Sequence, residues 1–146
     1  MEQFTDYKSQ LERQHREYVT LCVEKDTLLQ NGEDTTNRTA PQGYSWIDYW
    51  RAMSGNHRSE LSCSSCGKII FADDVPEIMR KVYRMIGGSV HDHVAHGGHL
   101  MVEASPTGDY AGGFYIAPLC PQCNAQRGKK IKIRKGTLLC REITVP

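Results

Sequence analysis

The sequence predicts an α+β fold in which an N-terminal helical segment precedes a zinc-stabilised domain. Three observations predict it. Apolar residues recur every three to four positions near the N-terminus, which is typical of a helix. Two Cys-x-x-C pairs, Cys63-Ser-Ser-Cys66 and Cys120-Pro-Gln-Cys123, have the ligand spacing of a zinc site. Residues 130–134 alternate between basic and apolar side chains, which is typical of a half-buried strand.

Residues 4–30 are expected to form one long helix, and Asn31-Gly32 follows as a helix stop. Gln14 and Lys25 interrupt the apolar pattern. We therefore interpret the helix as amphipathic and packed on its own domain, with a dimerising coiled coil as the alternative. The apolar positions are Phe4, Tyr7, Leu11, Tyr18, Leu21 and Leu28.

A polar stretch, residues 32–44, is expected to form a loop and a candidate boundary. Ser45-Trp-Ile-Asp48 then has the pattern of a capping box and predicts a short helix over 46–53. We assign its aromatic residues, Trp46, Tyr49 and Trp50, to the core; a platform for stacking bases is the alternative. Residues 1–60 are accordingly expected to form the helical segment, and residues 61–146 the zinc-binding domain.

Within residues 61–146 the patterns predict one inserted helix, three strands and one short helix. The helix covers residues 74–86, with Pro76 in its first turn and Gly87-Gly88 at its end. Strands are expected over 89–94, 114–118 and 130–134, and a helix over 121–124. The face shared along the inserted helix consists of Val75, Ile78, Met79, Val82 and Ile86.

The four paired cysteines are candidate ligands of one structural zinc ion. Each Cys-x-x-C turn presents two thiolates, and two such turns complete a tetrahedral shell. The N-terminus lacks a secretory signal pattern, which argues against a disulfide framework. The two other cysteines, Cys22 and Cys140, have no Cys-x-x-C partner, and we interpret both as buried small apolar residues.

The separation of the two pairs is unusually long, because 53 residues lie between Cys66 and Cys120. Loop-closure entropy grows only logarithmically, so tripling a zinc loop costs on the order of 1 kcal/mol. Structural zinc contributes roughly 10–16 kcal/mol in small peptides. The insertion is therefore compatible with a single zinc site.

Charge is distributed unevenly along the chain. The whole chain carries a formal charge of +1, yet residues 121–146 contain seven basic residues and one acidic residue, a net charge of +6. This concentration favours nucleic acid as a partner. A solvated edge strand, in which lysine discourages aggregation, is the alternative. The candidate nucleic-acid-binding residues are Lys129, Lys130, Lys132, Arg134 and Lys135.

Neither a membrane span nor an export signal is visible. No apolar run approaches the ~20 residues that cross a bilayer. We therefore expect a cytoplasmic protein without a membrane partner.

Residues 61–130 carry a recognisable order of motifs. Cys63-Ser-Ser-Cys66-Gly67 is followed by Asp92-His93, by Gly97-Gly98, and by Leu119-Cys-Pro-Gln-Cys-Asn124. This order resembles the HNH nucleases with a four-cysteine zinc, and most nearly the bacterial and phage recombination endonuclease VII type. The resemblance implies a treble-clef (ββα-metal) fold. The phrase Tyr115-Ile-Ala-Pro-Leu-Cys120 also looks like small bacterial zinc proteins that carry a Gly-Ala-His before it, a slot that Gly97-Gly98-His99 would fill.

The same resemblance implies an endonuclease site. Asp92 and the Asn124 amide oxygen would hold Mg²⁺, and His93 would deprotonate the attacking water; His99 competes with His93 for this role. The sequence departs from the pattern because no histidine follows His99. A catalytic and a non-catalytic module therefore both remain open.

The histidines of residues 91–99 permit a second interpretation. His91, His93 and His96 read as H-x-H-x-x-H, as in metallo-β-lactamase-like hydrolases, although Ala95 stands where that pattern has aspartate. Two or three of His91, His93, His96 and His99 would then bind a second zinc. We favour a hydrated, glycine-flanked loop instead.

Three function classes follow. The leading prediction is a zinc-binding HNH-like module that binds nucleic acid or a protein partner. The enzyme alternative is a Mg²⁺-dependent endonuclease using Asp92, His93 and Asn124. The third class is a protein-interaction or inhibitor module that acts through the N-terminal helices.

Overall fold

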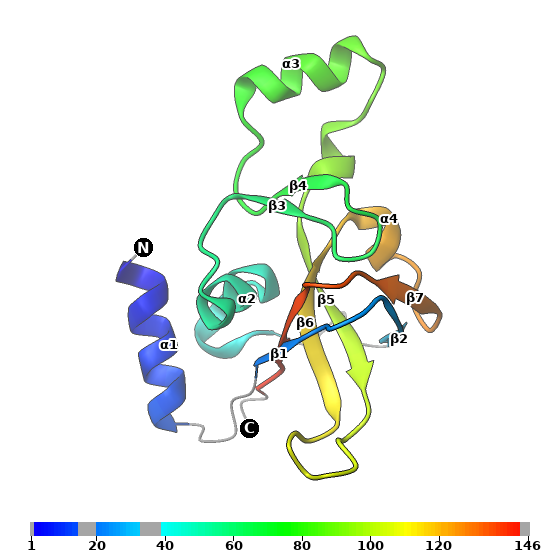
Figure 1. Cartoon of the computed structure of the whole chain (residues 1–146). Helices are drawn as coiled ribbons and strands as arrows, with labels where there is room; N and C mark the ends of the chain where they lie inside the picture. Colours follow the sequence, from blue (N-terminus) through cyan, green and yellow to red (C-terminus); the bar gives the residue numbers. More distant parts are fainter. Residues whose placement is uncertain (1, 15–19, 33–38, 144–146) are drawn as a thin grey trace.

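A computed structural model describes residues 2–14, 20–32 and 39–143 of the chain (Figure 1). Within these ranges the chain forms four α-helices, two short 3-10 helices and eight strands. The helical elements are α1 (Glu2–Gln14), η1 (Pro41–Gly43), α2 (Trp46–Ser54), α3 (Glu77–Met85), η2 (Val90–His93) and α4 (Pro121–Asn124). The strands are β1 (Thr20–Cys22), β2 (Thr27–Asn31), β3 (Glu60–Ser62), β4 (Ile69–Phe71), β5 (His96–Val102), β6 (Gly113–Leu119), β7 (Lys130–Ile133) and β8 (Leu138–Arg141).

Antiparallel pairing organises the strands of this described part into two sheets. A six-stranded sheet has the order β1-β8-β6-β5-β2-β7, and β3 and β4 form a separate hairpin. The longest contact in the large sheet joins β5 to β6, from His96 opposite Leu119 to Val102 opposite Gly113. The fold is therefore of the predicted mixed α+β class.

The predicted helix over residues 4–30 is wrong beyond Gln14. Thr20–Cys22 pairs with β8, and Thr27–Asn31 lies between β5 and β7; residues 15–19, with Tyr18, lie outside the described residues. Apolar spacing in this segment also fits a strand, because Leu29 faces the buried side of β2 while Leu28 is 63% exposed. Pairing with strands that lie far away in the sequence decides whether this segment forms a helix or a strand.

The N-terminal segment and the predicted zinc domain share one hydrophobic core. Phe4, Tyr7 and Leu11 of α1 are buried in it together with residues from the strands of the C-terminal half, such as Leu100 and Ile133. The apolar face of α1 is thereby occupied by the protein's own core, as the packed-helix interpretation predicts. The boundary expected at residue 60 thus runs through a continuous core.

The short helix over residues 46–53 is confirmed. Ser45 caps α2, because its hydroxyl accepts a hydrogen bond from the backbone N–H of Asp48 at 3.2 Å. Tyr49 and Trp50 are buried, and the Trp50 indole Nε1 donates to the carbonyl oxygen of Leu138 at 2.7 Å. Trp46 is half-buried against Tyr49 and His99. The assignment of these aromatic residues to the core is confirmed for Tyr49 and Trp50.

Gly97 explains how closely α2 approaches the sheet. A Cβ atom at this position would lie 2.5 Å from the backbone carbonyl carbon of Trp46 and 2.7 Å from the backbone nitrogen of Ile47. Real Cβ contacts of this length do not occur, so the first turn of α2 can rest on β5 only over glycine. The neighbouring Gly98 gives similar room to Leu119 and Asn124.

Helix α3 forms as predicted but buries its apolar face only in part. Tyr83 is 6% exposed and packs with Phe71 and Val75 in a small separate cluster. Three of the apolar residues expected to share one face, Ile78, Val82 and Ile86, are 71%, 41% and 75% exposed. The helix lies at one end of the molecule (Figure 1), and its residues Met79 and Tyr83 pack in that cluster.

The strand predicted over residues 89–94 is wrong. Residues 90–93 form the 3-10 helix η2, where the N–H of Asp92 donates to the carbonyl of Ser89. Valine and histidine permit a strand here, but local turn hydrogen bonds take the backbone groups that a strand would pair. His91 and His93 therefore do not share a strand face.

The remaining C-terminal predictions are confirmed. The strands over 114–118 and 130–134 correspond to β6 and β7, and the helix over 121–124 to α4. Cys140 is buried as predicted, and burial raises the pKa of its thiol to about 12. Cys22 is exposed, so its predicted burial is wrong: it ends a short edge strand of the sheet.

Among the residues that the model describes, no helix combines the length and the apolar composition needed to cross a bilayer.

Candidate metal centre and cationic strand

Four cysteines from two distant segments meet at one point. The Sγ atoms of Cys63, Cys66, Cys120 and Cys123 all lie within 4.8 Å of one another. Those of Cys66 and Cys120 are 3.8 Å apart. A Zn–S bond of about 2.3 Å predicts an edge of roughly 3.8 Å for a tetrahedron of thiolates. The donor set and its spacing therefore fit zinc.

Tight local turns position each cysteine pair. The first pair lies in the turn between β3 and β4, where the N–H of Cys63 donates to the carbonyl of Lys68. Gly67 closes this turn with a φ of 81°, a conformation that favours glycine. Cys120 is the N-cap of α4, and its Sγ accepts from the N–H of Cys123 at 3.5 Å. Both turns aim two sulfur atoms in one direction.

The long insertion is folded structure that brings the two turns together. Residues 67–119 contain β4, α3, η2, β5 and β6. The last strand leads directly into Cys120, and the N–H of Ser64 donates to the carbonyl of Pro118 at 2.9 Å. This hydrogen bond ties the first turn to the end of β6. The ordered insertion thus closes the metal site without a long flexible loop.

The thiols differ in how easily they ionise. Burial raises the pKa of Cys120 and of Cys123. Burial opposes ionisation of Cys63 as well, but backbone N–H groups of Cys120, Cys66 and Ser65 outweigh it and lower its pKa. Zinc binds thiolates, so loading the site displaces protons from the buried thiols, and affinity for the metal falls as the pH falls.

The three nuclease candidates lie on neighbouring elements with separate contacts. Asp92 accepts a hydrogen bond of 2.6 Å from the Nε2 of Gln122, which joins η2 to α4. The His93 ring stacks on Tyr83, and its Nδ1 lies 2.8 Å from the carbonyl oxygen of Ile69. Asn124 accepts at its backbone carbonyl from Asn31, while its side-chain oxygen lies beside Gly98.

His99 occupies a different environment from the other histidines. It is 5% exposed on β5, and its Nε2 lies 2.8 Å from Oε2 of Glu142, whose side chain is also 5% exposed. The rings of Trp46 and Phe114 meet it edge-on. This pair is a buried ionisable contact inside the core. Sequence spacing gave no sign of it, because 43 positions separate the two residues.

The histidines of residues 91–99 do not assemble a metal site among the described residues. In that part of the chain the four-cysteine group is the cluster of metal-ligating side chains that the structure brings together. His91 is exposed, and the imidazole of His99 contacts the side chain of Glu142. Burial lowers the pKa of the half-buried His96, and the charges of His91 and Arg127 lower it further.

The cationic strand has the predicted alternation. Ile131 and Ile133 of β7 are buried, while the five predicted basic residues are exposed. Asp26 lies among them: it is 3.4 Å from the Nζ of Lys132 and accepts from the backbone N–H of Lys135. That backbone hydrogen bond, together with the Lys132 contact, lowers the pKa of Asp26. Five basic side chains, Lys129, Lys130, Lys132, Arg134 and Lys135, therefore stand on one edge of the sheet.

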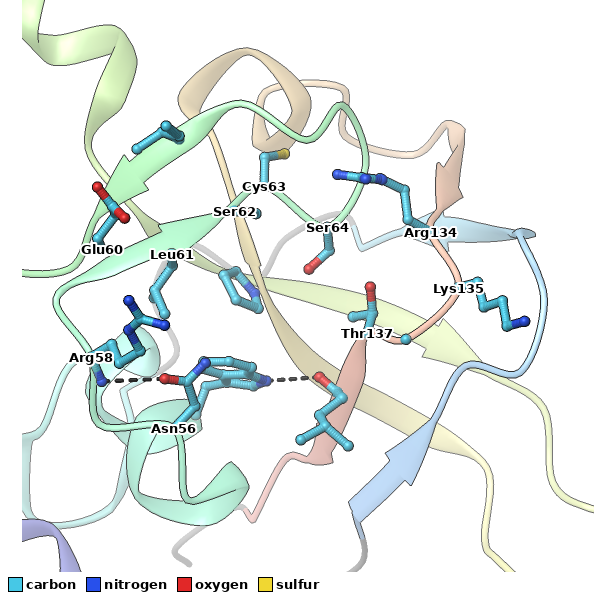
Figure 2. Close-up of a pocket in the computed structure, with 15 residues that line it drawn as sticks. Asn56, Arg58, Glu60, Leu61, Ser62, Cys63, Ser64, Arg134, Lys135 and Thr137 are labelled. Carbon is cyan, nitrogen blue, oxygen red and sulfur yellow. Dashed lines mark hydrogen bonds between the residues drawn. The ribbon is translucent and has the colours of Figure 1, made fainter.

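A pocket next to this strand was not predicted. It lies between the segment that enters the first cysteine turn and the turn between β7 and β8 (Figure 2). Arg58 and Arg134, 76 positions apart, both line it. No local motif marks such a site, since most of its lining comes from two short runs, residues 60–64 and 134–138, that lie far apart along the chain.

Comparison of the chain with models of protein families, with curated proteins and with solved structures finds no match, so the four-cysteine cluster and the exposed cationic strand are the findings on which a function can be argued.

Proposed function

We propose that this protein is a zinc-stabilised, HNH-like treble-clef module that binds nucleic acid through the cationic strand. The observation that carries the proposal is the one-sided exposure of β7, which buries Ile131 and Ile133 and directs its lysines to solvent. Phosphate contacts made by lysine and arginine supply most of the affinity in non-specific nucleic-acid binding. The cysteine cluster supports the proposal because it joins the turn of the β3–β4 hairpin to the end of β6 and the start of α4.

The treble-clef part of the proposal rests on the placement of the two cysteine pairs. The first pair lies in a β-hairpin turn and the second begins a helix, after a second hairpin formed by β5 and β6. That order is the one the HNH resemblance implies. Helix α4 has only four residues, so the helix of the proposed treble clef is short.

Salt dependence tests the nucleic-acid interface. Replacing Lys130 and Lys132 with glutamine is expected to make the plot of log affinity against log salt shallower by about 2, because each lost phosphate contact removes about 0.9 from the slope. The measurement is fluorescence anisotropy of a labelled duplex across a salt series. A strand whose lysines only discourage aggregation would leave the slope unchanged.

Helix α3 offers a control with the same change in net charge. Lys81 and Arg84 are exposed and lie at the far end of the molecule from β7 (Figure 1). The double substitution Lys81→Gln, Arg84→Gln should leave the slope at its wild-type value. An equal loss in this control would show that binding responds to total charge, and no binding at about 50 mM salt would contradict the proposal.

A Mg²⁺-dependent endonuclease is the second candidate, favoured by the hydrogen bond between Asp92 and Gln122. That contact packs η2 against α4, the two elements that carry the candidate residues. Asp92 and Asn124 supply oxygen ligands of the kind that Mg²⁺ takes, and the ion would polarise a phosphodiester. A carbonyl only accepts, so the Ile69 contact assigns the proton of His93 to Nδ1 and makes Nε2 the basic nitrogen.

Plasmid and branched DNA incubated with Mg²⁺ or Mn²⁺ test this candidate. If the site is catalytic, His93→Ala should lower the cutting rate about a hundredfold or more, the usual contribution of a general base, and Asn124→Ala should lower it by removing an oxygen ligand of the metal ion. His91→Ala is the control, because His91 is an exposed neighbour. Cutting that survives both substitutions would contradict a site built from these residues.

A further inference from the structure

The pocket beside the cationic strand has the size of a small-ligand site. Its volume is about 440 Å³. Pockets that hold drug-sized molecules span roughly 300–1,000 Å³. Arg58 and Arg134 lie on opposite sides of it, and Ser64 and Thr137 face each other near Arg134 (Figure 2). The pocket is open to solvent and joins the end of β7 directly, since Arg134 follows Ile133.

Part of the pocket lining is apolar and held firmly. Trp50, Leu61, Pro118 and Leu138 contribute to it. The Trp50 indole is kept in place by its 2.7 Å hydrogen bond to the carbonyl oxygen of Leu138. Trp50 and Leu61 are each only 5% exposed, so they form a buried apolar floor against which the edge of a nucleobase in the pocket would pack. The hydroxyl groups of Ser64 and Thr137 lie beside them and can form hydrogen bonds to polar base edges (Figure 2).

The rim of the pocket is cationic. Arg58, Arg134 and Lys135 line it, against one carboxylate, Glu60. Arg134 also passes over the first cysteine turn: a Cβ on Gly67 would lie 2.3 Å from its guanidinium. Its backbone N–H donates to the carbonyl of Ser64 at 2.8 Å. A guanidinium group can donate two parallel hydrogen bonds to a phosphate group. The contact with the cysteine turn positions the guanidinium of Arg134.

We infer that the pocket receives one unpaired nucleotide of a single-stranded nucleic acid whose backbone continues along the cationic strand. The inference rests on the proposed function and adds strandedness to it. Bases in a duplex are paired and stacked and cannot enter a side pocket, whereas an unpaired base can turn out of the strand. The phosphate of the nucleotide in the pocket then contacts Arg134, and the phosphates of the neighbouring nucleotides contact Lys132 and Lys130.

Two labelled probes of equal length test the inference: a ~12-nucleotide single strand and the matching duplex. We expect the single strand to bind about tenfold more tightly, the contribution of one base contact. Thr137→Trp fills the pocket and keeps every positive charge, because Thr137 is half-buried and its side chain points into the pocket (Figure 2). This variant should lose the preference for the single strand while its affinity for the duplex stays unchanged.

Arg58→Gln is the second variant, and it tests the inference if Thr137→Trp does not fold, as judged by its zinc content. This substitution should lower the affinity for the single strand several-fold more than the affinity for the duplex. The inference is overturned if both folded variants keep the wild-type preference, if duplex and single strand bind equally, or if polyglutamate competes as well as unlabelled oligonucleotide. Failure of the proposed function differs from these results, because then neither probe binds and Lys130 and Lys132 have no effect.

Discussion

Cys123→Ser is expected to abolish binding of zinc and to unfold the region built around it. The substitution removes one of four thiolates whose Sγ atoms lie within 4.8 Å of one another. Structural zinc contributes roughly 10–16 kcal/mol in small peptides, which matches or exceeds the roughly 5–15 kcal/mol by which a whole domain is stable. Loss of the metal should therefore release the β3–β4 hairpin, which carries few other core residues, and the pocket that its turn helps to line.

Metal content per chain by elemental analysis, followed by thermal unfolding, measures this effect. Cys22→Ser is the matched control, because Cys22 is an exposed cysteine outside the cluster. It should retain one zinc ion per chain and unfold at the wild-type temperature. A Cys123→Ser protein that still carries one equivalent of zinc with wild-type stability would contradict the four-cysteine site. A strong chelator added to the wild type should reproduce the loss.

His99→Ala is expected to destabilise the protein by about 3 kcal/mol, because it removes a buried ring from the core and a polar contact from a buried carboxyl group. The substitution leaves the Glu142 side chain, only 5% exposed, without the imidazole that lies 2.8 Å away. It also opens a space between the rings of Trp46 and Phe114, which meet His99 edge-on. For a chain of this length the melting temperature should fall by roughly 10 °C or more.

A double-mutant cycle separates the pair from general damage to the core. His99→Ala and Glu142→Ala should together cost less than the sum of their separate effects, because the second substitution removes the polar group that the first one deprives of its contact. His91→Ala, which alters an exposed histidine, should change stability by no more than about 0.5 kcal/mol. Equal effects of His91→Ala and His99→Ala would show that the contact contributes nothing to stability.

Local signals in the sequence predicted several elements accurately. The capping pattern at Ser45 predicted α2, and alternation predicted β7 with Ile131 and Ile133 inside. These features depend on neighbouring residues, so their physical cause is contained in a short segment. The same holds for the cysteine turns, because each Cys-x-x-C spacing shapes its own loop.

Competition between distant partners explains the main errors. The segment after Gln14 has apolar residues at positions that suit either a helix or a strand. It becomes β1 and β2 because β8, β5 and β7 supply hydrogen-bonding edges. The sequence predicted an apolar face along α3, yet only Tyr83 is buried on this helix. The periodicity of a sequence shows that one face of a helix is apolar. How much of that face is buried depends on how the helix packs against the rest of the protein.

Residue spacing predicted two Cys-x-x-C turns able to bind a metal ion together and a strand with one basic side, because each turn and each strand consists of residues close together along the chain. Tertiary structure alone decided which surfaces join. It brought the two cysteine turns to one point, closed the His99–Glu142 contact, and placed Arg58 across a pocket from Arg134. The reason is physical: side chains interact through space, and pairs separated by tens of residues become neighbours only when the sheet and core have formed.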